Sequence, residues 1–331
     1  MAKTLHYTGI TLDRAATRRR DEAWVDAHLN HAATRFIPLW QGRSLICMTE
    51  TGDTVPEPVF LTGAAAQALI VEAGTTVILG VEHEGLENEI AYVAADISTL
   101  DEQAAGEISA RADAGEFMDL RRVGAVMAGD MGALLAYARG MIHWHQRHRF
   151  CGVCGKPTQS RDGGYMRVCS DEDTPHTHFP RTDPAVIMLV AHANPEGQGP
   201  ACLLGRQKKW VEGMYSTLAG FVDPGETLEE AVAREVEEES AIRVTDVRYQ
   251  ASQPWPFPSS LMLGFRARAT TTEIDIDPRE IEDARWFTPE ELKNFGEWAN
   301  GPAVNGEMRL PRRDSIARRL IDDWLEDVAG G

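Results

Sequence analysis

The stretch Gly220–Ile242, GFVDPGETLEEAVAREVEEESAI, decides how the rest of the chain is interpreted. Thr227 followed three residues later by Glu230 is typical of a capping box, in which each side chain satisfies a backbone N–H of the first helical turn. Apolar residues then recur at helical spacing and predict one buried face. They are Leu228, Ala231, Val232 and Val236. We therefore predict a helix that begins just after the Pro224-Gly225 turn.

The opposite face of this predicted helix is strongly acidic. Glu235, Glu238 and Glu239 are three and four positions apart, so they meet on one side, where like charges repel. A solvated acidic face is the simplest interpretation of such a run. A divalent cation would remove the repulsion, because hard cations bind carboxylate oxygens and Mg²⁺ is held by carboxylates together with substrate phosphates. The pattern thus indicates a candidate metal site, with Arg234 beside it.

The order of residues in this stretch resembles the Nudix box. The matching positions are Gly220, Glu226, Arg234, Glu235, Val236, Glu238, Glu239 and Ile242. One position departs from the family pattern, because Ala241 stands where the family has Gly. If the helix ends there in a left-handed conformation, Ala costs roughly 1 kcal/mol relative to Gly. The departure concerns local stability more than the metal ligands.

Composition narrows the class of protein. The 331 residues suffice for two or three domains, and 51 acidic against 33 basic residues give a net charge of −18. This charge disfavours tight binding of long nucleic acids. No signal peptide or long apolar run is evident, so we expect a cytoplasmic protein that does not bind membranes. Five cysteines in this context favour thiols or metal over disulfides, and Cys47 and Cys202 are expected to be buried.

Residues 1–145 predict a mixed α/β domain without recognisable chemistry. The expected elements are a helical segment Arg14–Ala33, strands at Ser44–Met48, Thr76–Gly80 and Ile90–Ala94, and a helix Met127–Gln146. His143 and His145 would not face each other on that helix, so we expect packing or surface roles for them.

Residues 146–181 have the pattern of a zinc ribbon. The candidate ligands of one structural zinc ion are Cys151, Cys154, Cys169 and either His176 or His178. A histidine is expected because no cysteine follows Cys169 nearby. A redox CxxC motif is the competing interpretation, although no thioredoxin-like βαβ pattern surrounds it, and a ribbon that has lost its metal is another.

Residues 182–331 predict the catalytic domain. Expected strands are Ala185–Ala191, Ala201–Leu204, Ser216–Phe221, Arg243–Gln250 and Leu261–Ala269, and a last helix lies near Asp314–Val328. A helix between strands of a mixed sheet is typical of an α/β/α sandwich. The resemblance implies the Nudix topology for this sandwich, within a chain of the α/β (α+β) class.

Two further stretches narrow the resemblance. Ser252–Ser260, SQPWPFPSS, contains three prolines and is therefore expected to be extended and not an interior strand. It resembles the SQPWPFPxS signature of the NADH pyrophosphatase branch of the Nudix family, which includes NAD-capped RNA hydrolases. Phe179–Ile187, FPRTDPAVI, resembles the join between ribbon and Nudix domain in that branch. The resemblance is strong over about residues 130 to 325.

This branch implies hydrolysis of the diphosphate of NADH or NAD⁺ to AMP and nicotinamide mononucleotide, with Mg²⁺ or Mn²⁺. It also implies removal of an NAD cap from the 5′ end of RNA. The implied catalytic residues and metal ligands are Glu235, Glu238, Glu239 and Glu280. Asp283 rivals Glu280, because on a helix the two would share a face. Gly220, Glu226 and Arg234 are expected to support the motif, with Glu226 paired to Arg234.

The resemblance also implies substrate-binding residues. Phe179 and Phe221 are expected to stack on the nicotinamide ring, and the alternative for each is a place in the core. Gln253 and Ser260 are expected near the ligand. Trp255 is expected to reach across the interface of a homodimer.

Two other functions remain open from the sequence. One is a Nudix hydrolase of another dinucleotide, such as ADP-ribose or a diadenosine polyphosphate. The other is a non-enzymatic nucleotide-sensing scaffold, which Ala241 and the missing fourth cysteine favour. The intact carboxylates argue for an enzyme, because a scaffold has no need to keep repelling charges together.

Overall fold

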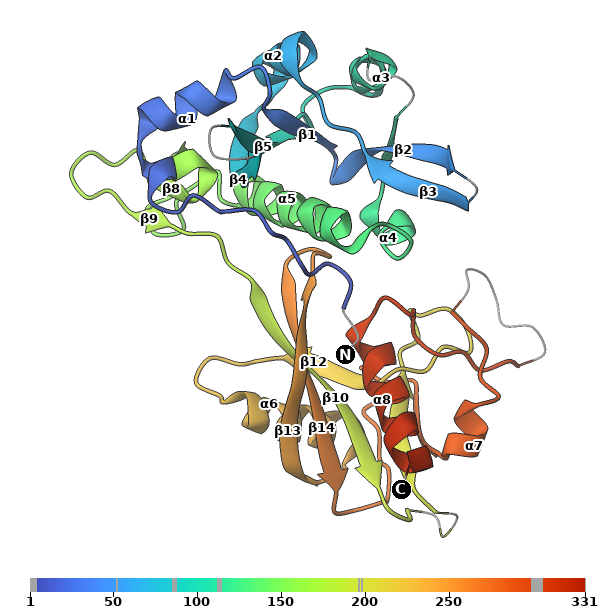
Figure 1. The fold of residues 1–331 in the computed structure, drawn as a ribbon. Helices are drawn as coiled ribbons and strands as arrows, with labels where there is room; N and C mark the ends of the chain where they lie inside the picture. The colour runs from blue at the N-terminus through green and yellow to red at the C-terminus, as the bar shows by residue number, and fades with distance from the viewer. Residues whose placement is uncertain are drawn as a thin grey trace. The chain divides into compact units, whose positions relative to one another are not determined.

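The computed structural model describes residues 5–51, 53–84, 88–111, 115–195, 197, 199–298 and 306–330. The chain divides into two compact units (Figure 1). The N-terminal unit is His6–Thr182 with Trp255–Ser259, and the C-terminal unit contains Asp183–Pro254 and Ser260–Gly331. In the described part of the chain, no helix is both long and apolar enough to cross a membrane.

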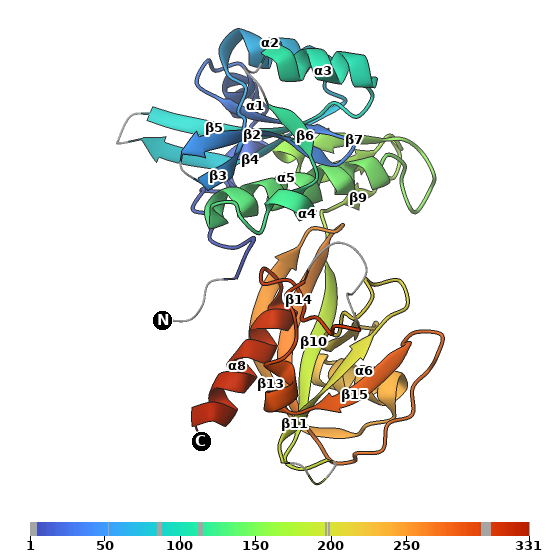
Figure 2. The same cartoon turned by 90° about the vertical axis from the view of Figure 1, so that its right-hand side faces the viewer.

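The N-terminal unit is built on a sheet with helices on both faces. Its strands are β1 Arg35–Trp40, β2 Arg43–Thr51, β3 Asp53–Pro58, β4 Thr75–Glu84, β5 Asn88–Asp96 and β6 Glu116–Met118, in the order β3-β2-β1-β5-β4 with β6 beside β2. Its helices are η1 Arg18–Arg20, α1 Glu22–Leu29, α2 Gly63–Glu72, α3 Glu102–Arg111, α4 Leu120–Val123 and α5 Gly129–Arg147. Figure 2 shows α2 and α3 on one face of the sheet and α5 on the other.

Alternation along the strands explains this layering. Ile37 and Leu39 pack in the core beneath α5, whereas Phe36 packs in the core with α2 and α3.

The predicted strands and the predicted helix at Met127–Gln146 are confirmed. The predicted helical segment Arg14–Ala33 is too long, because Asp21 caps α1 by accepting a hydrogen bond from the backbone N–H of Ala23.

The ribbon segment forms a small antiparallel sheet of its own. It consists of β7 Thr158–Arg161, η2 Asp162–Gly164, β8 Met166–Cys169 and β9 Thr177–His178. The hairpin tip lies against β4, where a Cβ on Gly164 would come within 2.9 Å of the Val77 methyl groups. His145 of α5 is buried and contacts the Gly164 carbonyl at 2.8 Å, so its predicted packing role is confirmed.

The C-terminal unit is a mixed sheet between two helices. Its elements are β10 Asp183–His192, β11 Ala201–Arg206, β12 Leu218–Phe221, α6 Leu228–Ser240, β13 Val244–Trp255, β14 Ser260–Ala269, β15 Asp283–Phe287, α7 Pro289–Leu292 and α8 Ile316–Gly330. The strand order is β13-β14-β10-β11-β15, with β12 paired to β10. The long strand β10 is parallel to β14 and antiparallel to β11 and β12.

Residues of β10 alternate between the two cores of this unit. Val186 and Met188 pack in the core with α6, and Ile187 and Leu189 pack in the core with α8. Figure 1 shows α6 and α8 on opposite sides of these strands. The predicted α/β/α sandwich is therefore confirmed. Strand β13, which carries Ser252–Trp255 of the SQPWPFPSS run, lies at the edge of the sheet as expected. The expectation that the whole run is extended is wrong, because residues 256–259 form the turn that leads into β14.

The two cysteines in apolar runs differ. Cys202 is fully buried on β11, as predicted. The prediction that Cys47 is buried is wrong, because β2 leaves the core at this point. Ile46 is buried, Cys47 is half-buried, and the next residue, Met48, is 47% exposed.

Helix α6 begins and ends at the residues that the sequence indicates. Thr227 and Glu230 form the complete capping box. At the other end Ala241 has φ 57° and ψ 11°, and its N–H donates to the Glu237 carbonyl at 2.8 Å. This left-handed conformation favours glycine, because the Cβ of an L-residue crowds the following carbonyl.

We predict that Ala241→Gly stabilises the protein against unfolding by about 1 kcal/mol, because it removes this backbone strain. Denaturant unfolding measures the change. Ala233→Gly, inside the same helix, is the matched control and should destabilise by about 1 kcal/mol. A loss of stability in Ala241→Gly similar to the control would show that the left-handed cap carries no strain.

Candidate active site and metal centre

A close approach between a strand and a helix fixes the first carboxylate. Glu235 of α6 is only 9% exposed and lies against the backbone of β12. A Cβ built on Gly220 would lie 1.8 Å from the carboxyl carbon of Glu235 and 2.0 Å from each of its oxygens. Only glycine can therefore occupy position 220 while Glu235 keeps this place.

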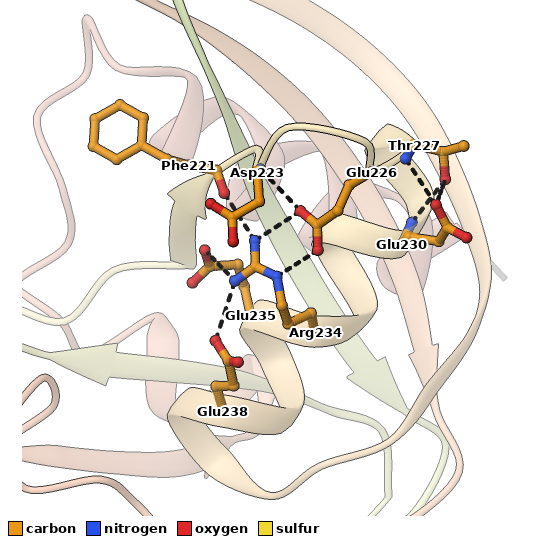
Figure 3. Close-up of polar contacts among 8 residues, drawn as sticks. All are labelled: Phe221, Asp223, Glu226, Thr227, Glu230, Arg234, Glu235 and Glu238. Carbon is orange, nitrogen blue, oxygen red and sulfur yellow. Dashed lines mark hydrogen bonds and ion pairs between the residues drawn. The ribbon is translucent and has the colours of Figure 1, made fainter.

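Arg234 joins the helix to the loop that precedes it (Figure 3). Its Nη2 donates to Glu226 Oε2 and to the Phe221 carbonyl, both at 2.9 Å. Its Nη1 donates to Glu235 at 2.8 Å and to Glu238 at 3.1 Å. The guanidinium thus stands between two carboxylates of the acidic face and reduces their repulsion.

Glu226 holds the other side of this guanidinium and forms the ion pair with Arg234 that was expected. Its Oε2 also accepts the backbone N–H of Asp223 at 3.0 Å. The hydrogen bonds from Arg234 and then from the Asp223 N–H lower the pKa of Glu226 to about 2. Glu226 is therefore ionised across the neutral range and supports the turn into α6.

Glu239 is the carboxylate that most clearly requires a cation. It is 3% exposed, and its Oε2 has no hydrogen-bond partner among the described residues. Burial first, and then the charges of Glu235, Glu280 and Glu238, raise the pKa of Glu239 to about 8. An unsatisfied buried carboxyl is costly, and a divalent cation bound by its free oxygen would compensate. The donor set therefore fits the metal site predicted from the sequence.

These carboxylates line a pocket of about 530 Å³ within the C-terminal unit. Its acidic lining residues are Asp223, Glu235, Glu239, Glu280 and Glu282, and its basic ones are Lys208, Lys209 and Arg279. Glu238 projects from the same helix, half-exposed, and is held by Arg234. Acidic and basic groups in one pocket suit a ligand that is bound partly through cations and partly through its own negative charge.

The basic residues of this pocket were not predicted from the sequence. Gln207, Lys208 and Lys209 follow β11 directly, and Arg279 lies in the turn before β15. A run of two lysines is uncommon in so acidic a chain, and this signal could have drawn attention to the loop. The loop lines the same pocket as Glu235 and Glu239 of α6 because of the sheet topology, which the run itself does not reveal.

Glu280 lines the pocket as expected. The expectation that Asp283 shares a helical face with Glu280 is wrong. Residues 278–280 form a turn and not a helix, and Asp283 begins β15. The carboxylate of Asp283 accepts a hydrogen bond from the Tyr215 hydroxyl and pairs with Arg285 at 2.7 Å. Asp283 is therefore engaged in the fold, whereas Glu280 lines the pocket beside Glu235 and Glu239.

The predicted substrate-binding residues lie in different places. Phe179 is 63% exposed in the N-terminal unit and Phe221 is 61% exposed in the C-terminal unit, so neither belongs to a core. Phe221 lines the pocket, and its ring points away from Arg234 in Figure 3. Ser260 is half-buried at the start of β14. Trp255 belongs to the N-terminal unit, where it packs edge-on against Tyr7.

Gln253 has a role that the sequence did not indicate. Its side chain is fully buried. Its amide nitrogen donates to the Asp314 carbonyl at 2.7 Å, and its amide oxygen accepts the N–H of Ile316 at 2.7 Å. Gln253 thus connects β13 to the first turn of α8. Because its side chain is fully buried, the structure does not support the expected position of Gln253 beside a ligand.

The ribbon cysteines converge with a histidine. The ligand atoms of Cys151, Cys154, Cys169 and His176 all lie within 4.8 Å of one another. The backbone N–H of His176 donates to Cys169 Sγ at 3.1 Å, which lowers the pKa of that thiol. Three sulfurs and one imidazole nitrogen fit a structural zinc ion. His178 lies outside this group of four, with its Nε2 3.3 Å from Cys151 Sγ.

The fold and this site together define a hydrolase domain of the Nudix type. Three family models match the chain: the NUDIX domain over residues 182–304, the NADH pyrophosphatase zinc ribbon domain over 146–179, and the NADH pyrophosphatase-like rudimentary NUDIX domain over 33–144. The chain belongs to the Nudix hydrolase family, in the branch that carries the NADH pyrophosphatase zinc ribbon. It is therefore an enzyme that acts on a pyrophosphate bond.

Named relatives extend over different parts of the chain. The human NAD-capped RNA hydrolase NUDT12 is 36% identical over 348 residues, covering 97% of this chain and 73% of the human protein. Nudix hydrolase 19, chloroplastic, of Arabidopsis thaliana is 37% identical and covers 78% of this chain and 61% of the plant protein. The NAD-capped RNA hydrolase NudC of Mycobacterium bovis is 42% identical over 213 residues, covering 63% of this chain and 65% of its own length.

We predict that Gly220→Ala lowers turnover about 100-fold, because the added Cβ displaces the Glu235 carboxylate and a shift of about 1 Å can have that effect. Steady-state kinetics with a dinucleotide substrate measure the loss. Gly140→Ala is the matched control, since no atom lies within 4 Å of its added Cβ. Full activity in Gly220→Ala would contradict the proposed contact.

For the ribbon, Cys151→Ser should destabilise the protein by more than about 3 kcal/mol while harming the chemistry less, because loss of a structural metal is a recognised cause of large destabilisation. Metal analysis and thermal unfolding test this. Cys47→Ser, outside the cluster, should retain zinc and stability. Wild-type protein that contains no zinc would remove the basis of the prediction.

Proposed function

We propose that this enzyme cleaves the diphosphate of NADH or NAD⁺ into AMP and nicotinamide mononucleotide, and that it removes NAD caps from RNA. The proposal rests on one pocket that is lined both by the carboxylates Glu235, Glu239 and Glu280 and by Lys208 and Lys209. Such a pocket matches a substrate whose two phosphates must be neutralised before water can attack. We also propose that it acts as a homodimer in the cytoplasm.

The acidic and basic residues of the pocket have different roles in the proposed reaction. Glu235, Glu238, Glu239 and Glu280 would hold Mg²⁺ or Mn²⁺. When bound, such cations neutralise phosphate charge and lower the pKa of a coordinated water. Lys208 and Lys209 can donate to phosphate oxygens. Arg279 pairs with Asp277 through its Nε and Nη2 and adds positive charge at the same pocket. Glu280, exposed at the pocket, either binds the cation or accepts the proton of the attacking water.

The choice of substrate rests on the relatives and on the aromatic residues. The human and mycobacterial relatives are named as NAD-capped RNA hydrolases. Phe221, exposed at the pocket, offers a face on which a nicotinamide ring can stack, and Phe179 offers a second exposed ring. The charge of −18 favours contact with the short capped end of an RNA over its body.

Product analysis tests the proposed reaction. Purified protein is incubated with NADH and Mg²⁺ or Mn²⁺, with and without chelator, and the products are separated by chromatography. We expect equal amounts of AMP and reduced nicotinamide mononucleotide, abolished by the chelator. Cleavage of ADP-ribose or a diadenosine polyphosphate without cleavage of NADH would overturn the choice of substrate, and the same assay on NAD-capped RNA tests decapping.

Glu238→Gln should lower turnover at saturating Mg²⁺ by a large factor, at least about 100-fold, with little effect on unfolding, because it removes ligand charge but keeps the shape of the side chain. Glu229→Gln, an exposed position on the same helix, is the matched control. Unchanged turnover in Glu238→Gln would exclude Glu238 as a metal ligand.

A further inference from the structure

A second pocket lies within the N-terminal unit, between the ribbon hairpin and the sheet. It encloses about 600 Å³, and its walls come from α1, the end of α2, the start of β4, and the β7–β8 hairpin. Three arginines line it: Arg19, Arg161 and Arg167. This accumulation of positive charge is unexpected in a chain with a net charge of −18. The proposed reaction uses none of these residues.

Arg167 is the buried member of the three, at 8% exposure. Its Nε donates to the Thr158 hydroxyl at 2.7 Å, its Nη2 to the Thr158 carbonyl at 2.8 Å, and its Nη1 to His145 Nδ1 at 2.8 Å. No carboxylate among the described residues pairs with it. Each terminal nitrogen keeps one further N–H without a protein partner in the described chain. A buried cation of this kind is costly unless an anion accompanies it.

The other two arginines are less buried than Arg167. Arg19 is half-buried and stacks over the Tyr165 ring, 3.2 Å from its centroid. Arg161 is exposed and donates to the Ser160 carbonyl and to the Gln159 side chain. Within the described residues, neither forms an ion pair with a carboxylate.

Two carboxylates do line the pocket, Glu22 and Asp26, but both are exposed on α1. Solvent screens these two charges, whereas Arg167 is buried. Three arginines against two carboxylates leave the lining of the pocket with an excess of positive charge.

The walls of the pocket are held in place by close packing. Gly163 and Gly164, at φ 59° and 99°, form the hairpin tip. A Cβ on Gly163 would come 3.2 Å from Arg19 Cβ, and one on Gly164 would come 2.9 Å from Val77. Two neighbouring elements thus approach the tip closely, and the arginines are presented from a fixed backbone, which lowers the entropy lost on binding.

We propose that this pocket binds a small phosphate monoester. The dianion of such a group matches several guanidinium groups, and the planar fork of arginine binds phosphate oxygens in pairs. The volume is that of an ordinary small-molecule site and accommodates a mononucleotide as well as inorganic phosphate. The proposal concerns a site in the N-terminal unit and does not depend on which dinucleotide the C-terminal unit cleaves.

Calorimetric titration of the full chain with inorganic phosphate, and separately with AMP, tests this without added Mg²⁺ or Mn²⁺. Arg161→Gln removes an exposed member of the pocket, so the fold should persist. Arg20→Gln is the matched control, since Arg20 is exposed, adjoins Arg19 in the chain and does not line the pocket. Binding to wild type that weakens at least tenfold in Arg161→Gln but not in Arg20→Gln is the expected result.

The two probes distinguish the ligand. Because AMP is also a product of the proposed reaction, only the binding that Arg161→Gln weakens is assigned to this pocket. If that binding is tighter for AMP than for phosphate, the pocket is a nucleotide site, and if the two are equal, it is a site for the anion alone. Absence of binding to wild type, or equal affinities in both variants, would overturn the proposal. NADH turnover measured in parallel should be the same in all three proteins, so a failure here is distinct from a failure of the proposed reaction.

Discussion

The contact between the Glu235 carboxylate and the backbone at Gly220 is the constraint on which the active site depends. It places α6 directly against β12, with no side chain between them at this point. Arg234, next to Glu235 in the helix, then reaches both the preceding loop and the acidic face. Loop, strand and helix are thereby joined around one set of carboxylates, and the position of each depends on the others.

The repulsion between these carboxylates destabilises the C-terminal unit, and packing elsewhere in the unit compensates for this cost. The strand β10 contributes to two cores, one with α6 and one with α8, so the sheet beneath the site is buried on both faces. The raised pKa of Glu239 expresses the cost of burying charge near charge. The fold can bear this cost because the surrounding sandwich holds the carboxylates in place. A bound cation would offset the cost by neutralising their charge.

The sequence predicts the parts of this structure that local rules control. The capping box, the apolar face of α6, the converging ribbon cysteines and the edge position of β13 follow from spacing and residue type. It does not predict what depends on tertiary contacts. Lys208 and Lys209 meet the carboxylates only through the sheet topology, and Asp283 is engaged by Tyr215 on another segment. Likewise, nothing local shows that Gln253 is buried against α8.

The most direct test of the account is a titration with Mn²⁺, in which electron paramagnetic resonance reports the free ion. We expect wild-type protein to bind Mn²⁺, and we expect Glu239→Gln to weaken binding at least tenfold because it removes the unsatisfied buried carboxylate. Glu229→Gln, on the exposed part of the same helix, should bind as the wild type does. Equal binding in all three proteins would contradict the assignment of this acidic face as the metal centre.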